Sequence, residues 1–181
     1  MKNLVAIDVG HIGKTNKLRD KGANYKNVSE ADLVMLYAAL ARGWLEKEGI
    51  PTVFLTYGTY GERHQFCKKV GVDLHLQCHL NAAKGSYGLI GYRSTSANIC
   101  EPVADIFVNE FKDKLSLAKV NKLVLLKDDR RRNCTVAGIP SLLLEPLFLD
   151  NDKHFDYLIN GDAIDDIAEA ITCAVIIYVG E

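Results

Sequence analysis

The chain has 181 residues, of which 48% are hydrophobic and 25% are charged, and its formal net charge is −1. This size and composition predict one compact domain over residues 1–181, and the near-neutral charge excludes the basic field with which proteins bind nucleic acid through its phosphates. The longest apolar runs fall short of the ~18 residues of a membrane span, and Asp8 interrupts the amino-terminal run, so we expect a protein made in the cytoplasm without a signal peptide or stable membrane association.

The first fifty residues contain a strand pattern, a polar segment and a helix pattern. Leu4–Val9 is predicted to form a buried strand, and the polar residues 12–28 are predicted to form a long loop. Ser29 has the type and position of an N-cap residue, so Glu30 lies in the first turn of a helix that ends at Gly49. The apolar face predicted for this helix consists of Leu33, Leu36, Tyr37, Leu40, Trp44 and Leu45.

The rest of the chain continues the alternation of strands and helices. Further strands are predicted at Thr52–Thr56, Asp73–His79, Tyr87–Arg93, Lys122–Leu126 and Ser141–Leu144. Helices are predicted at Glu62–Val70, from Asn98 or Glu101 to Phe111, and from Asp162 to about Tyr178. Such an alternation is typical of an α/β domain with a largely parallel sheet that helices cover on both faces.

The run IPSLLLEPLFLDN, residues 139–151, combines a buried strand with a single carboxylate. Its apolar residues suffice for one strand in the middle of a sheet, and Glu145 lies at the carboxyl end of that strand. A buried carboxylate is costly unless it has a partner or a function, so Glu145 is a candidate functional residue. The alternative is that Glu145 is simply the first exposed residue after the strand.

Polar side chains that suit a metal follow two other predicted strands. His11 and His79 each end a strand, as Glu145 does, and Glu30 opens the first helix. Functional groups of parallel sheets gather at the carboxyl ends of the strands, and two imidazoles with one carboxylate and an open fourth position are the ligand set of a catalytic zinc. Each residue also has a structural interpretation, because a strand-end histidine can satisfy backbone groups and an acid in a first helical turn interacts favourably with the helix dipole.

The remaining histidines, the cysteines and the charged run 127–132 are not expected to bind zinc. His75 lies on the same strand face as His79 but roughly 13 Å away, so both cannot bind one ion along a straight strand. His64 and His154 are expected at the surface or in hydrogen bonds. The five cysteines are widely spaced without a C-x-x-C pair, which predicts reduced thiols, and the mixed-sign run 127–132 is predicted to be a solvated loop.

Several segments match one family pattern in order along nearly the whole chain. They are VAIDVGHIG at 5–13 with DKGA at 20–23, SEADL at 29–33, the spacing from Arg63 to Asp73 that leads into LQCHLNAA at 76–83, and IPSLLLEPLFLDN at 139–151. Taken together, these segments are specific. The sequence resembles the zinc-dependent N-acetylmuramoyl-L-alanine amidases of the third amidase type, which occur in bacterial wall-remodelling enzymes and in phage endolysins.

This resemblance implies a ligand set and a reaction. His11, Glu30 and His79 would hold zinc, and Glu145 would be the catalytic carboxylate that helps hydrolyse the amide between N-acetylmuramic acid and L-alanine in peptidoglycan, the expected partner. The implied fold is a twisted, mostly parallel sheet of about six strands with helices on both faces, forming a single catalytic domain without a separate wall-binding domain. Departures from the family pattern are Ile12 for a glycine, Cys67 for an alanine, Gln77 for a serine, and Pro146 after the glutamate.

Several alternatives stay open on the sequence. The chain has the features of a phage endolysin that acts on the wall after release, but a bacterial wall-remodelling or mother-cell amidase has the same chemistry. A different zinc hydrolase and a non-catalytic peptidoglycan-binding module are further alternatives. Asn81 either orients substrate, braces the loop after His79 or only forms a turn.

Overall fold

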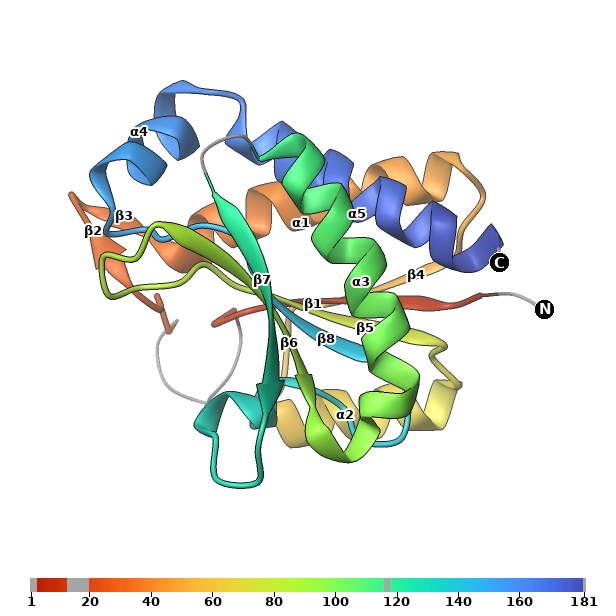
Figure 1. Ribbon diagram of the computed structural model, residues 1–181. Helices are drawn as coiled ribbons and strands as arrows, with labels where there is room; N and C mark the ends of the chain where they lie inside the picture. The colour runs from red at the N-terminus through yellow and green to blue at the C-terminus, as the bar shows by residue number, and fades with distance from the viewer. Residues whose placement is uncertain (1–2, 13–19, 116–117, 181) are drawn as a thin grey trace.

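A six-stranded sheet forms the centre of the computed structural model, which describes residues 3–12, 20–115 and 118–180 (Figure 1). The strands lie in the order β4 (Thr52–Leu55), β1 (Val5–Val9), β5 (Leu74–Cys78), β8 (Ser141–Glu145), β6 (Tyr87–Arg93) and β7 (Lys119–Leu125). Neighbouring strands are parallel except for β6 and β8, which pair antiparallel. The sheet is therefore mostly parallel, as the sequence predicts, and β8 lies in its middle.

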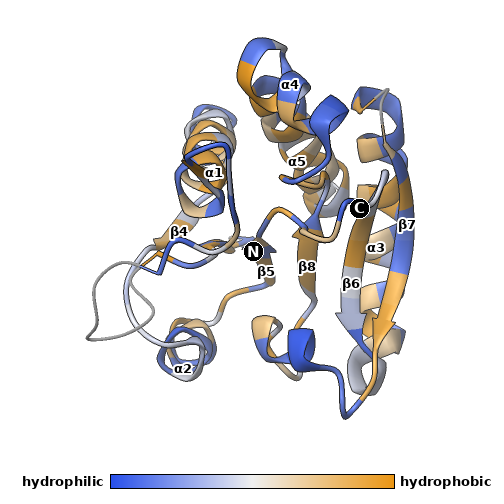
Figure 2. Ribbon diagram, turned by 90° about the vertical axis from the view of Figure 1, so that its left-hand side faces the viewer, coloured by the Kyte–Doolittle hydropathy of each residue, from blue (hydrophilic) through white to orange (hydrophobic). Residues whose placement is uncertain are grey.

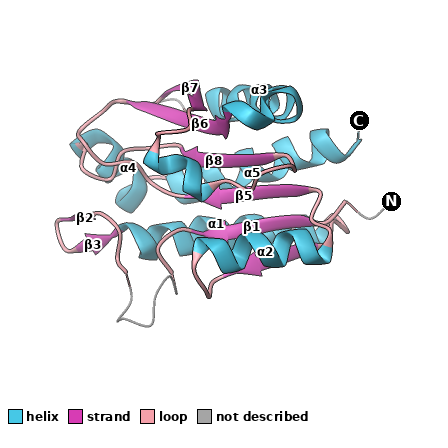
Figure 3. Cartoon of the chain, turned by 90° about the horizontal axis from the view of Figure 1, so that it is seen from below, coloured by secondary structure: helices cyan, strands magenta, loops and turns pink. Residues whose placement is uncertain are grey.

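Helices cover both faces of this sheet. The helices α1 (Glu30–Lys47), α3 (Ala97–Lys114) and α5 (Ala163–Gly180) lie on one face, and α2 (Tyr60–Val70) lies on the other with the short 3-10 helix η2 (Arg130–Cys134) beside it (Figures 1 and 3). A second 3-10 turn, η1 (Ser94–Ser96), precedes α3, and α4 (Asp152–Asn160) precedes α5. In the described part of the chain, no helix has the length and apolar character needed to cross a membrane.

The two faces of the sheet differ in character. The face under α1, α3 and α5 carries the main apolar core, and all three helices contain apolar stretches, coloured orange in Figure 2. Alternate residues of β1 and β5 point to the other face, where Asp8, Arg63, His75 and Gln77 are at most 1% exposed. This buried polar layer under α2 leads to the carboxyl ends of the strands.

The structure confirms each predicted strand and helix, with ends that shift by a few residues. The Ser29 hydroxyl accepts a hydrogen bond from the Asp32 backbone N–H at the start of α1, and Gly49 follows the helix with φ 76°. Leu36 was predicted on the apolar face of α1 but is 53% exposed, because the buried face of this helix runs through Val34, Ala38 and Ala41 instead.

The prediction of a continuous loop over residues 12–28 is wrong where the structure describes it. Strands β2 (Asn24–Tyr25) and β3 (Val28–Ser29) form a small antiparallel hairpin, and residues 13–19 lie outside the described residues. The two turn residues of the hairpin, Lys26 and Asn27, both have positive φ. Two-residue strands leave no periodic pattern in a sequence, which explains the difference.

Candidate active site

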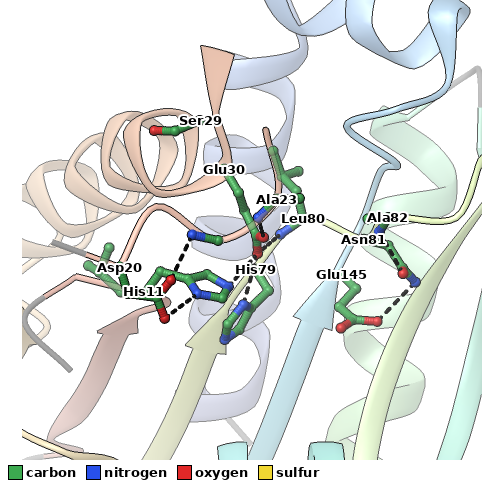
Figure 4. A network of polar contacts seen from close by, with 12 residues as sticks. His11, Asp20, Ala23, Ser29, Glu30, His79, Leu80, Asn81, Ala82 and Glu145 are labelled. Atoms are coloured by element: carbon green, nitrogen blue, oxygen red, sulfur yellow. Dashed lines mark hydrogen bonds and ion pairs between the residues drawn. The ribbon is translucent and has the colours of Figure 1, made fainter. Parts of the chain in front are cut away.

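The carboxyl ends of β1, β5 and β8 meet at one edge of the sheet and bring the predicted polar residues together (Figure 4). His11 follows β1, His79 follows β5, and Glu145 is the last residue of β8. Glu30 is the first residue of α1, whose amino terminus reaches the same edge. All four side chains that the sequence selected thus lie in one site.

His11, Glu30 and His79 form a tight cluster. The Glu30 Oε1 atom lies 3.1 Å from His11 Nε2 and 2.9 Å from His79 Nδ1. One ligand atom from each residue lies within 4.8 Å of the others, and the two imidazole rings meet edge to face. This spacing allows the three side chains to bind one metal ion.

The Glu30 carboxylate is fixed by the backbone as well as by the two histidines. Its Oε2 atom accepts a hydrogen bond from the Ala23 N–H at 2.9 Å, and its Oε1 atom accepts one from the Leu80 N–H at 3.1 Å. Burial opposes ionisation, but the hydrogen bonds and charges of His11 and His79 outweigh it and hold the pKa of Glu30 well below its usual range. Glu30 is therefore present as a carboxylate, which is the form that binds metal.

His11 is held in an unusual conformation by the residues around it. Its φ is 64°, in the left-handed region, and its Nδ1 atom lies 3.1 Å from Asp20 Oδ2. The other Asp20 oxygen accepts a hydrogen bond from the Gly22 N–H at 3.0 Å. A Cβ atom on Gly22 would lie 2.6 Å from both the Glu30 carboxylate and the His11 ring, so this position requires glycine. The carboxylate–imidazole pair fixes the ring orientation, as around many bound metals.

His79 is held by contacts at both of its ring nitrogens and at its backbone carbonyl. Its Nδ1 atom faces Glu30, while its Nε2 atom lies 3.4 Å from the Gln77 amide and 3.5 Å from the Tyr60 hydroxyl. The buried Tyr37 hydroxyl donates a hydrogen bond to the His79 carbonyl at 3.0 Å. Gln77 and Tyr60 thus contact the ring of His79, and Tyr37 fixes its backbone.

Glu145 stands apart from the cluster but faces the same pocket. The Asn81 side-chain amide donates a hydrogen bond to Glu145 Oε2 at 3.0 Å (Figure 4). Burial raises the pKa of Glu145 to about 7, against the opposing charge of Arg131. Glu145 is 9% exposed, so the alternative of a stray exposed residue after the strand is wrong.

A pocket of about 400 Å³ joins these residues. It is lined by His11, Ala23, Glu30, Tyr60, His79, Leu80, Asn81, Ala82, Arg130, Arg131, Cys134 and Glu145. The prediction that residues 127–132 form a solvated loop is wrong for residues 130–132, which belong to the 3-10 helix η2, and Arg130 and Arg131 of this helix line the pocket. The cluster and Glu145 share one space in which a substrate has room to lie between them.

The other histidines lie away from the cluster, as the sequence analysis expects. His75 is fully buried beneath it, with its ring nitrogens 2.8 Å from Ser141 Oγ and 3.2 Å from Asp8 Oδ2. His154 accepts a hydrogen bond from the Phe148 N–H at 3.0 Å, and His64 lies half-buried in α2. In the described chain, no cysteine forms a disulfide.

Sequence reasoning missed three polar residues of this site. Asp20 lies in the DKGA segment that matched the family pattern, but a loop carboxylate gives no sign that its partner is His11. Tyr60, in the first turn of α2, and Arg131, in η2, carry no motif at all. Their roles depend on contacts between segments that are far apart in the sequence.

The chain is similar to known proteins both in sequence and in fold. A family model described as N-acetylmuramoyl-L-alanine amidase matches residues 5–176. The endolysin of Bacillus phage SPP1 is 25% identical over 93% of this chain and 63% of its own length, so the chain spans less than two thirds of that relative. Two of the similar solved structures illustrate the shared fold. The N-acetylmuramoyl-L-alanine amidase AmiC2 of Nostoc punctiforme is 19% identical with a TM-score of 0.81, and the match covers 100% of this chain and 99% of that one. An N-acetylmuramoyl-L-alanine amidase from Clostridium difficile 630 is 23% identical with a TM-score of 0.80, and the match covers 98% of this chain and 97% of that one.

Proposed function

Because the chain belongs to the N-acetylmuramoyl-L-alanine amidase family, we propose that it hydrolyses the amide bond between the lactyl group of N-acetylmuramic acid and the first L-alanine of the peptidoglycan stem. The observation that carries this proposal is the His11–Glu30–His79 cluster facing a separate buried carboxylate, Glu145, across one pocket. Amide hydrolysis needs both an electrophilic centre and a proton acceptor, and this arrangement supplies a place for each. A non-catalytic binding module has no need for the buried, costly Glu145.

We infer that the metal is zinc and that His11, Glu30 and His79 would hold it. Two imidazole nitrogens and one carboxylate oxygen are a donor set that zinc prefers, and three protein ligands leave a position for substrate. The second nitrogen of His11 faces Asp20, and that of His79 faces Tyr60 and Gln77, so neither ring needs to turn to present its ligand atom. When bound, zinc would supply a Lewis acid that polarises the substrate carbonyl and acidifies a water molecule.

In the proposed reaction, Glu145 moves the proton. Its carboxylate accepts a proton from the attacking water as the new C–O bond forms, and then gives that proton to the departing amine of L-alanine as the C–N bond breaks. Burial makes Glu145 a stronger base than an exposed carboxylate, because it raises the pKa to about 7. Asn81 holds Oε2 of this carboxylate and so orients the side chain in the pocket.

The substitution Glu145→Gln tests this assignment. It keeps the shape and an acceptor for Asn81 but removes the proton acceptor, so release of free amino groups from peptidoglycan should fall by about 10²- to 10⁴-fold while about one zinc per chain stays bound. Glu48→Gln, at an exposed carboxylate, is the matched control and should leave both unchanged. Near-normal turnover in Glu145→Gln would refute the catalytic role, and loss of zinc together with activity would make Glu145 a ligand.

We propose phage-induced lysis as the biological setting, with the enzyme made in the cytoplasm and acting on the wall after release. Support comes from the similarity to the endolysin of Bacillus phage SPP1. Cultures that express the chain should then keep their optical density until the cytoplasmic membrane is permeabilised and should lyse at once afterwards. Cultures that express Glu145→Gln should not lyse after permeabilisation. Gradual lysis without permeabilisation would favour a wall-remodelling enzyme that is exported by its host.

A further inference from the structure

We propose that Arg131 binds a free carboxylate of the peptide stem and thereby makes the enzyme favour stems whose second residue has a free α-carboxylate over stems in which that group is amidated. This inference rests on the proposed amidase function and adds a determinant of substrate choice. The second residue of a stem is a glutamate joined through its side chain, so its α-carboxyl group lies one residue beyond the scissile amide. A cation at the edge of the pocket is well placed to meet it.

Arg131 reaches the pocket from a segment that contributes no residue to the His11–Glu30–His79 cluster. It lies in η2, between β7 and β8, and lines the same 400 Å³ pocket as Glu145 and His79. The electrostatic effect between Arg131 and Glu145 is mutual, since the charge of each favours the ionised form of the other. A substrate group held by Arg131 therefore lies near the carboxylate that acts on the scissile amide.

Asp129 holds the guanidinium of Arg131 but uses only some of its hydrogen-bond donors. Asp129 accepts hydrogen bonds from Arg131 Nε at 3.2 Å and from Arg131 Nη2 at 3.0 Å, and also from the Arg131 backbone N–H at 2.9 Å. A guanidinium has five N–H donors in a planar fork, so this contact leaves the Nη1 amino group and one Nη2 hydrogen for another acceptor. No described residue accepts a hydrogen bond from Nη1, and the side chain is 41% exposed.

These features match the recognition of a carboxylate. Because Asp129 already fixes the side chain, binding a ligand costs little side-chain entropy. The remaining edge of the fork presents two donors in parallel, which is the geometry that a carboxylate accepts in a bidentate pair. A carboxamide offers one acceptor oxygen and an NH₂ group that faces the positive fork, so the amidated stem binds less well. The neighbouring Arg132 does not line the pocket and lies near Arg93.

A matched pair of substrates tests the inference. N-Acetylmuramoyl-L-alanyl-D-isoglutamate and the corresponding D-isoglutamine compound differ only in the α-carboxyl group, and the readout is the ratio of their kcat/KM values. We expect the wild-type protein to favour the acid by about tenfold, the effect of one charge-assisted hydrogen-bonded pair. Arg131→Gln should bring the ratio close to one, Arg131→Lys should give an intermediate ratio, and Arg132→Gln should keep the wild-type ratio.

The ratio separates substrate binding from an effect on Glu145. If Arg131 acts only through the basicity of Glu145, Arg131→Gln lowers both kcat/KM values by the same factor and leaves the ratio unchanged, which would overturn the inference. A wild-type ratio near one would overturn it as well. Should Arg131→Gln unfold, the ratio for the charge-conserving Arg131→Lys variant decides in the same way.

A binding measurement distinguishes failure of this inference from failure of the proposed reaction. If neither compound is cleaved, the amidase proposal is wrong for these substrates. The dissociation constants of the Glu145→Gln protein for the two compounds then decide the role of Arg131. Tighter binding of the acid that disappears in the Glu145→Gln, Arg131→Gln double variant supports carboxylate recognition, and equal dissociation constants refute it.

Discussion

At the scale of single residues, the site is assembled at a cost to stability, and Glu145 shows this most directly. Burial raises its pKa from the usual value of 4.5 to about 7. Between these pH values the unfolded chain loses the proton while the folded protein keeps it, so the folded state binds more protons and its stability falls as pH rises. The loss is complete above the folded pKa and amounts to about 3 kcal/mol. We therefore expect metal-free Glu145→Gln to gain stability over the wild type between pH 5 and pH 8.

Urea unfolding of both proteins at pH 5 and pH 8 in the presence of a chelator measures this difference. The contribution of Glu30 has the opposite sign, because its pKa is lowered, but it is common to both proteins and cancels. A stability difference that does not change with pH would contradict the raised pKa of Glu145.

At the scale of elements, α2 fixes the segment that carries His11. The Arg63 side chain, 1% exposed, pairs with Asp8 at the end of β1 and donates hydrogen bonds to the backbone carbonyls of Val9, at 2.9 Å, and Ile12. It therefore holds the chain on both sides of His11. Removal of one partner of a buried pair leaves the other charge uncompensated, so Arg63→Met should destabilise the protein by about 3–5 kcal/mol and weaken zinc binding.

The substitution Arg42→Met is the matched control for Arg63. Arg42 pairs with Glu46 at 2.8 Å on the exposed surface of α1, where both side chains are more than 40% exposed. Such a pair contributes about 0.3–0.5 kcal/mol, so urea unfolding should show a small loss for Arg42→Met and unchanged zinc affinity. Equal losses in the two variants would show that Arg63 is not a clamp for the His11 segment.

At the scale of the whole molecule, stability and function are divided between the two faces of the sheet. The face under α1, α3 and α5 buries the large apolar core, and its helices come from widely separated parts of the sequence. The face under α2 and η2 instead buries the polar layer of Asp8, His75 and Gln77, in which the Gln77 amide contacts the His79 ring. A strong apolar core allows the opposite face to retain these polar groups, which stabilise less than apolar packing does.

The sequence by itself determined the α/β alternation, the strand-end positions of His11, His79 and Glu145, and the place of Glu30 in the first turn of α1. These features are local, since hydrophobic periodicity and helix capping depend on residues a few positions apart. Tertiary structure decided what those residues contact. The pairing of Asp20 with His11, the clamp by Arg63, the brace from Asn81 to Glu145 and the entry of Arg131 into the pocket all join segments whose proximity depends on strand order and on the path of irregular loops. Strand order and loop paths leave no periodic signal in the sequence, because the path of a loop is fixed by the packing of the elements that it connects.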